Sequence, residues 1–383
     1  MKTYNRQLIF AAACAGLFLF GVGVITFGSI APDLKAKFSL DELEIGGLFS
    51  MFPLGILVGS LSFGPITDRS GYRLLLGACS AMLALGFAGI GLATALWMVQ
   101  LSIVLIGIGG GAINGATSAL VADISTENKG ASLALFGSFF GLGALAMPFV
   151  LGLLKGMVSF ETIVLIIAGF TFLLTLVYLA LRFPEAKHSE GVSLAHVGQM
   201  LKNPVLLLIG FFLFWQNCCE ALINNWTTSY LLEIQQLDGR WTLYALSSYV
   251  AGLSLMRILT GSVLSKIPAP KILQISMVFL VLGAIVLGWM SGLAWVFIGL
   301  VLLGFGLALG FPVMFGLSSS LYPKMSGTAI GIILVLSLFG NLLTNYIMGF
   351  LAKSWGIGVF SLALLVVTVV QAIFCVIVLK KAN

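Results

Sequence analysis

The sequence predicts an all-α membrane protein with twelve transmembrane helices, arranged as two parallel six-helix repeats. Two observations carry most of this prediction. The chain of 383 residues is 60% hydrophobic and only 8% charged, with a mean hydropathy of +1.14, so lipid rather than water must surround it. Its apolar runs are about 20 residues long and do not alternate with polar residues, which indicates helices rather than the strands of a barrel.

The expected spans divide into two halves around a polar stretch. The first half, 1–182, holds six spans at roughly 8–30, 43–63, 74–94, 97–120, 131–154 and 161–182. Residues 183–203 form a cytoplasmic linker that holds both histidines, His188 and His196, which we interpret as solvated linker residues rather than metal ligands. The second half, 204–383, holds six spans at roughly 204–232, 242–264, 272–290, 294–318, 326–350 and 357–379.

Glycines repeat between the two halves at a constant offset. Gly64 and Gly261 are 197 residues apart. The same offset relates the pair Gly107 and Gly109 to Gly304 and Gly306, and Gly130 to Gly327. Each coincidence falls at an equivalent point of an equivalent span, so the halves are predicted to be parallel repeats.

The basic residues indicate how the chain is oriented. Of the 19 lysines and arginines, five fall on one side of the expected spans, at Lys35, Lys37, Lys155, Arg240 and Lys353. Arg257 falls inside a span, and the remaining thirteen fall on the side that holds the linker and both termini. Because cytoplasmic loops carry the excess of positive charge, both termini are predicted to be cytoplasmic.

One face of span 204–232 is polar. Glu220 is the only acidic residue deep within an expected span, about 25 Å from its start at 1.5 Å per residue. Gln216 and Asn224 lie one turn on either side, and Thr227 extends the row. A carboxylate at this depth is costly unless it is paired, protonated or hydrated. Glu220 is therefore either a proton or substrate site, or a buried acid that only holds helices together.

Other polar side chains within the spans are weaker candidates. Trp226 either stacks on a sugar ring or belongs to an interfacial belt. Arg257 either anchors or gates helices, for example by binding carbonyls, or contacts substrate. Asn114, Asn341 and Asn345 are the groups that a site for neutral hydroxylated solutes needs, but they also suit hydrogen bonds between helices.

The segment Gly64–Arg73 concentrates charge between two apolar runs, which predicts a loop at the membrane surface. Its pattern is Gly-x-x-x-Asp-Arg-x-Gly-x-Arg, with Asp68, Arg69, Gly71 and Arg73 at the fixed positions. This pattern resembles the loop between the second and third helices of the major facilitator superfamily of transporters. The resemblance covers the whole chain and implies a solute site near the bilayer midplane, between the two halves.

The same loop is a candidate gate. Asp68 is placed to accept hydrogen bonds from a neighbouring helix and to pair with an arginine, so that it would latch the halves in one state. The second half has Ser265 where an acid would fall, so the latch is uneven. Asp123 is a further candidate partner for Arg69 and Arg73.

A narrower resemblance lies mainly in the second half. The runs Glu220-x-x-x-Asn224-x-Trp226-x-x-x-Tyr230-Leu231 and Gly252-x-x-x-x-Arg257-x-x-x-Gly261 are similar to the group of fucose–proton symporters and glucose/galactose transporters. This resemblance implies uptake of a monosaccharide or polyol driven by protons or sodium, with Glu220 in the coupling or binding role.

The leading expectation is therefore alternating-access symport of a small neutral, sugar-like solute with a proton or a sodium ion, by a monomer in a bacterial inner membrane. Proton-driven export of drugs or metabolites is the alternative, because Phe140 and Phe311 would suit an apolar cavity. A membrane sensor or scaffold that transports nothing would leave the polar row unexplained. The sequence holds no evident nucleophile–base pair, so an enzyme is not expected. The five cysteines have neither disulfide nor zinc spacing. We therefore expect no metal and no cofactor, and no nucleic-acid partner either.

Overall fold

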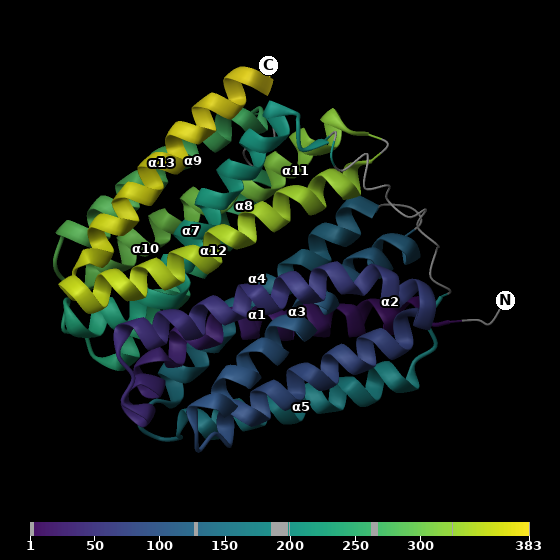
Figure 1. Cartoon of the computed structure of the whole chain (residues 1–383), viewed down its shortest axis with the longest axis horizontal. Helices are drawn as coiled ribbons and strands as arrows, with labels where there is room; N and C mark the ends of the chain where they lie inside the picture. The colour runs from purple at the N-terminus through teal and green to yellow at the C-terminus, as the bar shows by residue number, and fades with distance from the viewer. Residues whose placement is uncertain are drawn as a thin grey trace. The chain divides into compact units, whose positions relative to one another are not determined.

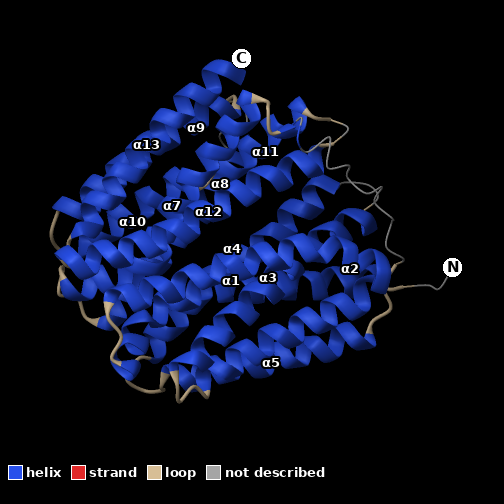
Figure 2. Ribbon diagram, in the orientation of Figure 1, coloured by secondary structure: helices blue, strands red, loops and turns tan. Residues whose placement is uncertain are grey.

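The structure is a computed structural model that describes residues 4–125, 129–184, 198, 200–261, 267–323 and 325–382. Helices joined by short loops make up the described residues, which contain no strand (Figure 2). Within the described ranges, eleven helices are long and apolar enough to cross a membrane. The expected linker histidines, His188 and His196, lie outside the described residues, as does Ser265.

The chain forms two compact units. Unit 1 comprises Met1–Leu40 and Met51–Ser189, and unit 2 comprises Asp41–Ser50 and Glu190–Asn383. The helices that begin in the first half of the chain are α1 (Arg6–Phe38), α2 (Glu42–Gly91), α3 (Leu96–Ile124), α4 (Lys129–Leu154) and α5 (Phe160–Ala180). Those of the second half are α7 (Pro204–Glu233), α8 (Gly239–Gly261), α9 (Ala269–Trp289), α10 (Leu293–Leu307), α11 (Gly310–Leu321), α12 (Ser326–Trp355) and α13 (Val359–Ala382) (Figure 1).

Helices of the described residues match all twelve expected spans, but α1 and α12 run past their expected ends, to Phe38 and Trp355, and two further segments differ from the prediction. The loop expected over Gly64–Arg73 is wrong in extent, because the segment is helical except at Gly71, where φ is 71° and ψ is 168°. A side chain is disfavoured at this φ, whereas glycine tolerates it. Gly71 alone therefore divides α2 into two spans.

The span expected over 294–318 is also interrupted, between α10 and α11 at Ala308 and Leu309. The cause is Pro312, which stands four residues after Ala308 and has no N–H to donate to the Ala308 carbonyl. The last carbonyls of α10 therefore need partners from other helices.

Glycine contacts confirm the repeat expected from the sequence. A Cβ at Gly107 would lie 2.6 Å from the carbonyl oxygen of Phe52, and a Cβ at Gly304 would meet the carbonyl oxygen of Tyr249. Tyr249 follows Phe52 by the same 197 residues that separate the two glycines. The offset also relates the contact of Gly55 with Val104 to that of Gly252 with Val301, and the contact of Gly86 with Ser102 to that of Gly283 with Gly299. Equivalent helices thus pack backbone to backbone in both units.

The start of α7 follows directly from local sequence. The Asn203 side chain accepts hydrogen bonds from the backbone N–H groups of Val205 and Leu206, and Pro204 occupies the first turn, where no N–H is needed. α7 then packs extensively against α12 and α13 within unit 2. This packing fixes which face of α7 is enclosed by protein.

Candidate functional site

The polar row of α7 is largely, but not completely, enclosed by protein. Gln216 and Thr227 are fully buried, and Glu220 and Asn224 are half-buried. The row lies at the helical spacing expected from the sequence, and its burial agrees with the argument that lipid would not tolerate it. We call this set of four side chains the α7 polar row: Gln216, Glu220, Asn224 and Thr227.

Gln216 joins Glu220 to the break between α10 and α11. Its Nε2 donates to Glu220 Oε1 at 3.2 Å and to the Leu307 carbonyl oxygen at 3.1 Å. Leu307 is the last residue of α10, so Gln216 supplies one of the donors that this helix end lacks. Gly310 makes room for the amide, because a Cβ at this position would overlap Gln216 Oε1.

Arg257 of α8 serves the same helix end. Its Nε donates to the Ala308 carbonyl oxygen at 3.1 Å, which is the carbonyl that Pro312 cannot serve. Arg257 and Glu220 also attract each other electrostatically. The carbonyl-binding role that the sequence left open for Arg257 is therefore present, and its guanidinium brings positive charge near the only acid of the α7 polar row.

Three atoms of the α7 polar row are buried without a hydrogen-bond partner among the described residues: Gln216 Oε1, Asn224 Oδ1 and Thr227 Oγ1. Buried polar atoms in native proteins are normally hydrogen-bonded, so an exception needs an explanation. Three such atoms along one helix face, next to a carboxylate, provide acceptors for a bound polar molecule.

Asn345 of α12 is the centre of a second buried cluster in unit 2. Its Oδ1 accepts from Asn225 Nδ2 at 3.0 Å and from Trp226 Nε1 at 3.2 Å. Its Nδ2 donates to Asn341 Oδ1 at 2.9 Å and to the Asn341 carbonyl oxygen at 3.0 Å. Asn345 is fully buried, so this amide holds α7 to α12 as interhelical hydrogen bonds do.

Trp226 is enclosed within this cluster. Its side chain has no exposed surface, and its ring meets Phe49 edge to face with 5.5 Å between centroids. An interfacial belt position, one of the two interpretations of the sequence, does not fit this burial. Contact of Trp226, Asn341 or Asn345 with a solute remains a prediction.

Asn114 of α3 is an exposed amide inside a membrane span of unit 1. Asn114 lies one helical turn after Gly110 and Gly111, and its direction around the helix axis falls between theirs. Gly110 faces Phe20 of α1, and Gly111 faces Ile56 of α2. An exposed amide on the face directed at α1 and α2, rather than at lipid, suits a polar cavity lining. Its role in solute binding is still a prediction.

The candidate gating residues lie on helix ends of unit 1. The Arg73 Nε donates to the Leu179 carbonyl oxygen at 2.6 Å, near the C-terminus of α5, where positive charge is favourable. Tyr72 donates its hydroxyl hydrogen to Asp123 Oδ2 at 3.2 Å. Asp68 is half-buried and Arg69 is exposed. Pairing of Asp123 with arginine, and a latch through Asp68, are not tested by these contacts.

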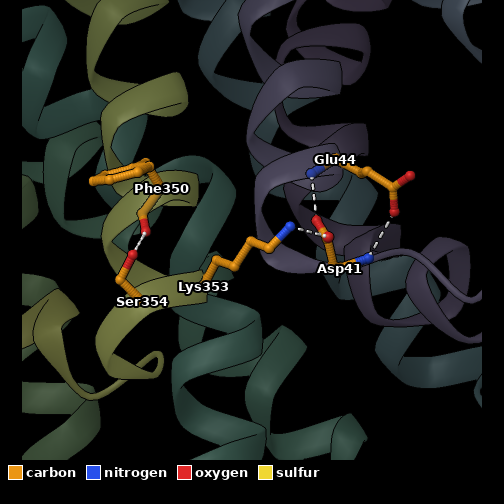
Figure 3. A network of polar contacts seen from close by, with 5 residues as sticks. All are labelled: Asp41, Glu44, Phe350, Lys353 and Ser354. Atoms are coloured by element: carbon orange, nitrogen blue, oxygen red, sulfur yellow. Dashed lines mark hydrogen bonds and ion pairs between the residues drawn. The ribbon is translucent and has the colours of Figure 1, made fainter.

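A capping box begins α2 and connects it to α12 within unit 2. Asp41 Oδ1 accepts from the Glu44 N–H and Glu44 Oε2 accepts from the Asp41 N–H, both at 2.9 Å. Lys353 of α12 donates to Asp41 Oδ2 at 2.8 Å (Figure 3). This hydrogen bond to Lys353 holds the pKa of Asp41 below its usual value.

Some residues of the site were missed in the sequence. Tyr249 of α8 is buried and interacts electrostatically with both Glu220 and Arg257. Gln371 of α13 is fully buried and accepts from Cys219 Sγ at 3.1 Å. A glutamine inside the apolar run 357–379 was a usable signal, whereas nothing local distinguishes Tyr249. In the described part of the chain, no group of metal-binding side chains occurs.

The repeat of helices and their length define a multi-pass membrane protein. Residues 13–343 match the Major Facilitator Superfamily. The chain therefore belongs to this superfamily.

Proteins that differ in the solutes they are named for are similar to this chain, either in sequence or in fold. The Escherichia coli (strain K12) protein named "Inner membrane transport protein YdiN" is 25% identical over 363 residues, which cover 92% of this chain and 86% of that protein. The crystal structure of the nucleoside transporter NupG is similar with a TM-score of 0.83 at 15% identity, covering 97% of this chain and 99% of that one. The D-xylose–proton symporter is similar with a TM-score of 0.80 at 14% identity, covering 96% and 97%.

These comparisons support the superfamily and not a narrower group. A nucleoside transporter and a sugar symporter are both similar to this chain in fold, at identities that show the fold alone. The narrower resemblance to fucose–proton symporters and glucose/galactose transporters is not confirmed.

Proposed function

We propose that this transporter carries a small neutral, hydroxylated solute, such as a sugar, together with a proton that binds Glu220. The site for the solute includes the α7 polar row. We further propose that it works by alternating access in a bacterial inner membrane, with both termini in the cytoplasm.

The observation that carries this proposal is the α7 polar row with its three unpartnered acceptors. Hydroxyl groups of a solute can donate to Gln216 Oε1, Asn224 Oδ1 and Thr227 Oγ1, which have no protein donor in the described structure. A hydroxylated solute would thereby satisfy atoms whose burial is otherwise unfavourable. Acceptors of this kind, without a further unpaired charge, favour a neutral solute over an ion.

Glu220 supports the proton in the proposal. It is the acid of the α7 polar row, and its described partners are one amide donor, from Gln216, and the field of Arg257. Neither neutralises the carboxylate by direct contact, so a proton is a chemically simple alternative counter-charge. A bound proton neutralises the Glu220 carboxylate, so that this side chain can move between hydrated and buried surroundings during the transport cycle at lower cost.

The test is uptake into proteoliposomes of a panel of neutral monosaccharides, polyols and nucleosides, with and without an inward proton gradient. The proposal predicts that at least one solute accumulates only with the gradient, and that Glu220→Gln allows equilibration but not accumulation. Glu233→Gln, the same change at the end of the same helix, is the matched control and should accumulate solute as the parent does.

Two results would contradict the proposal. Accumulation by Glu220→Gln equal to that of the parent would remove the coupling role. Transport of lipophilic cations out of the vesicles, with no uptake of any neutral solute in the panel, would favour the alternative function of drug or metabolite export.

A further inference from the structure

Resting on the proposed coupling at Glu220, we infer that Gln216 is a positioning residue that transmits the protonation of Glu220 to the break between α10 and α11. The inference concerns one side-chain amide that contacts both places. Gln216 Nε2 lies 3.2 Å from Glu220 Oε1 and 3.1 Å from the Leu307 carbonyl oxygen.

The helix end that Gln216 serves depends on partners from outside the helix. Pro312 removes the N–H that would bind the Ala308 carbonyl, and α10 ends at Leu307. Two side chains replace the missing donors, Gln216 at Leu307 and Arg257 at Ala308. Loss of either donor leaves a buried carbonyl without a partner, so the geometry of the break depends on them.

The amide of Gln216 can satisfy an ionised Glu220 and Leu307 together. Both the carboxylate and the carbonyl are acceptors, and Nε2 has two hydrogens, one for each. Gln216 Oε1 then points to Gly310 and has no described donor. The observed arrangement therefore satisfies the charged form of Glu220, which can only accept.

A proton from the aqueous phase changes this balance. When it binds a carboxylate oxygen of Glu220, the resulting O–H is a donor, and the unpartnered Gln216 Oε1 is an acceptor on the adjacent amide. A half-turn of the amide brings Oε1 to Glu220 and carries Nε2 away from both Glu220 and Leu307. The Leu307 carbonyl then loses its donor and would face an oxygen instead, so protonation loosens the end of α10.

The groups around Glu220 are compatible with this sequence of events. The described charged or titratable groups that interact electrostatically with Glu220 are Arg257 and Tyr249 from α8 and Cys219 from α7 itself. Arg257 stays on the Ala308 carbonyl, so it keeps one end of the break fixed while Gln216 changes partners. The effect should therefore be confined to the segment from Leu307 to Val313.

Hydrogen–deuterium exchange of the purified protein in lipid nanodiscs tests the inference without any solute. Exchange of the backbone amides of 307–311 and 313 would be measured at acidic and at mildly alkaline pH and corrected for the intrinsic pH dependence of exchange. We expect about tenfold faster corrected exchange at acidic pH in the parent, a factor equivalent to ~1.4 kcal/mol, the order of one hydrogen bond.

Three variants separate a positioning role from a merely structural one. Gln216→Met keeps the volume but removes the amide, and Gly310→Ala places a methyl group where Gln216 Oε1 lies and so displaces the amide while leaving Gln216 and Glu220 unchanged. Both should show fast exchange at either pH, without the pH dependence. Glu220→Gln should remove the pH dependence as well. The segment around Asn345 serves as an internal reference that should not respond.

The inference is overturned if Gln216→Met and Gly310→Ala keep the pH-dependent exchange of the parent, or if the parent shows none. Because this measurement uses no solute, it is independent of the uptake assay. If exchange stays pH-dependent in Gln216→Met and Gly310→Ala while Glu220→Gln no longer accumulates solute, the role of Gln216 is removed and the proposed coupling stands.

Discussion

The buried amide of Asn345 gives the sharpest stability prediction. Replacing Asn345 by leucine, which has a similar shape, removes the acceptor of two buried donors, Asn225 Nδ2 and Trp226 Nε1. It also removes the hydrogen bonds that Asn345 donates to Asn341. Both donors on α7 would then be buried without a partner, because Asn345 is fully enclosed.

The magnitude follows from the number of donors that lose their acceptor. Interhelical hydrogen bonds in membrane proteins contribute about 0.6 kcal/mol on average and at most about 1.7 kcal/mol in double-mutant cycles. Two of them give a loss of about 1–3.5 kcal/mol for Asn345→Leu. The range lies below the value expected in water, because the unfolded helices in a micelle also find partners.

Asn341→Leu is the matched control, one turn earlier on the same helix. Asn341 is half-buried, and without its amide Asn345 Nδ2 still donates to the Asn341 backbone carbonyl. This variant should lose less than half as much. Unfolding of the purified protein in mixed micelles, followed by circular dichroism as the fraction of denaturing detergent rises, gives both values. An Asn345→Leu protein as stable as the parent, or more stable than Asn341→Leu, would refute the reasoning.

Further predictions address the remaining contacts. The hydrogen bond with Lys353 lowers the pKa of Asp41, so it contributes stability that is present above the usual aspartate pKa and is lost as the pH falls through the lowered value. The thermal midpoint of the parent should therefore fall towards that of Asp41→Asn in acid. A difference between the two midpoints that stays constant with pH would contradict this. Gly340→Leu should destabilise the protein by more than about 2 kcal/mol, a typical cost of overpacking a core, because its Cβ would meet the Phe214 carbonyl oxygen. A variant with the expression yield and thermal midpoint of the parent would exclude that contact. Asp68→Asn should slow conformational exchange while leaving solute affinity nearly unchanged, as fluorescence and binding assays can determine; lost affinity with unchanged exchange would argue against a latch.

Much of the fold could be predicted from the sequence, because long apolar runs in a chain with few charges have few alternatives. The positions of the twelve spans follow from hydropathy, and the glycine offset of 197 residues holds because glycines mark backbone contacts that both units share. The α7 polar row was also predictable, since Gln216, Glu220 and Asn224 lie one helical turn apart.

The details that were not predicted depend on tertiary contacts or on one residue's backbone. The helix continues through Pro65 and breaks only at Gly71, although both residues favour a turn. The bond from Gln216 to Leu307 spans 91 residues, so no local pattern announces it. The break before α11 had a local signal in Pro312, but a single proline inside an apolar run is also compatible with a continuous helix.

Proton movement driven by the solute tests the central claim most directly. A solute that the parent accumulates would be added outside proteoliposomes that enclose no solute and no gradient, and the external pH would be followed with an indicator. The account predicts alkalinisation outside the parent vesicles and the Glu233→Gln vesicles, and solute entry without a pH change in the Glu220→Gln vesicles. Alkalinisation by Glu220→Gln equal to that of the parent would contradict it.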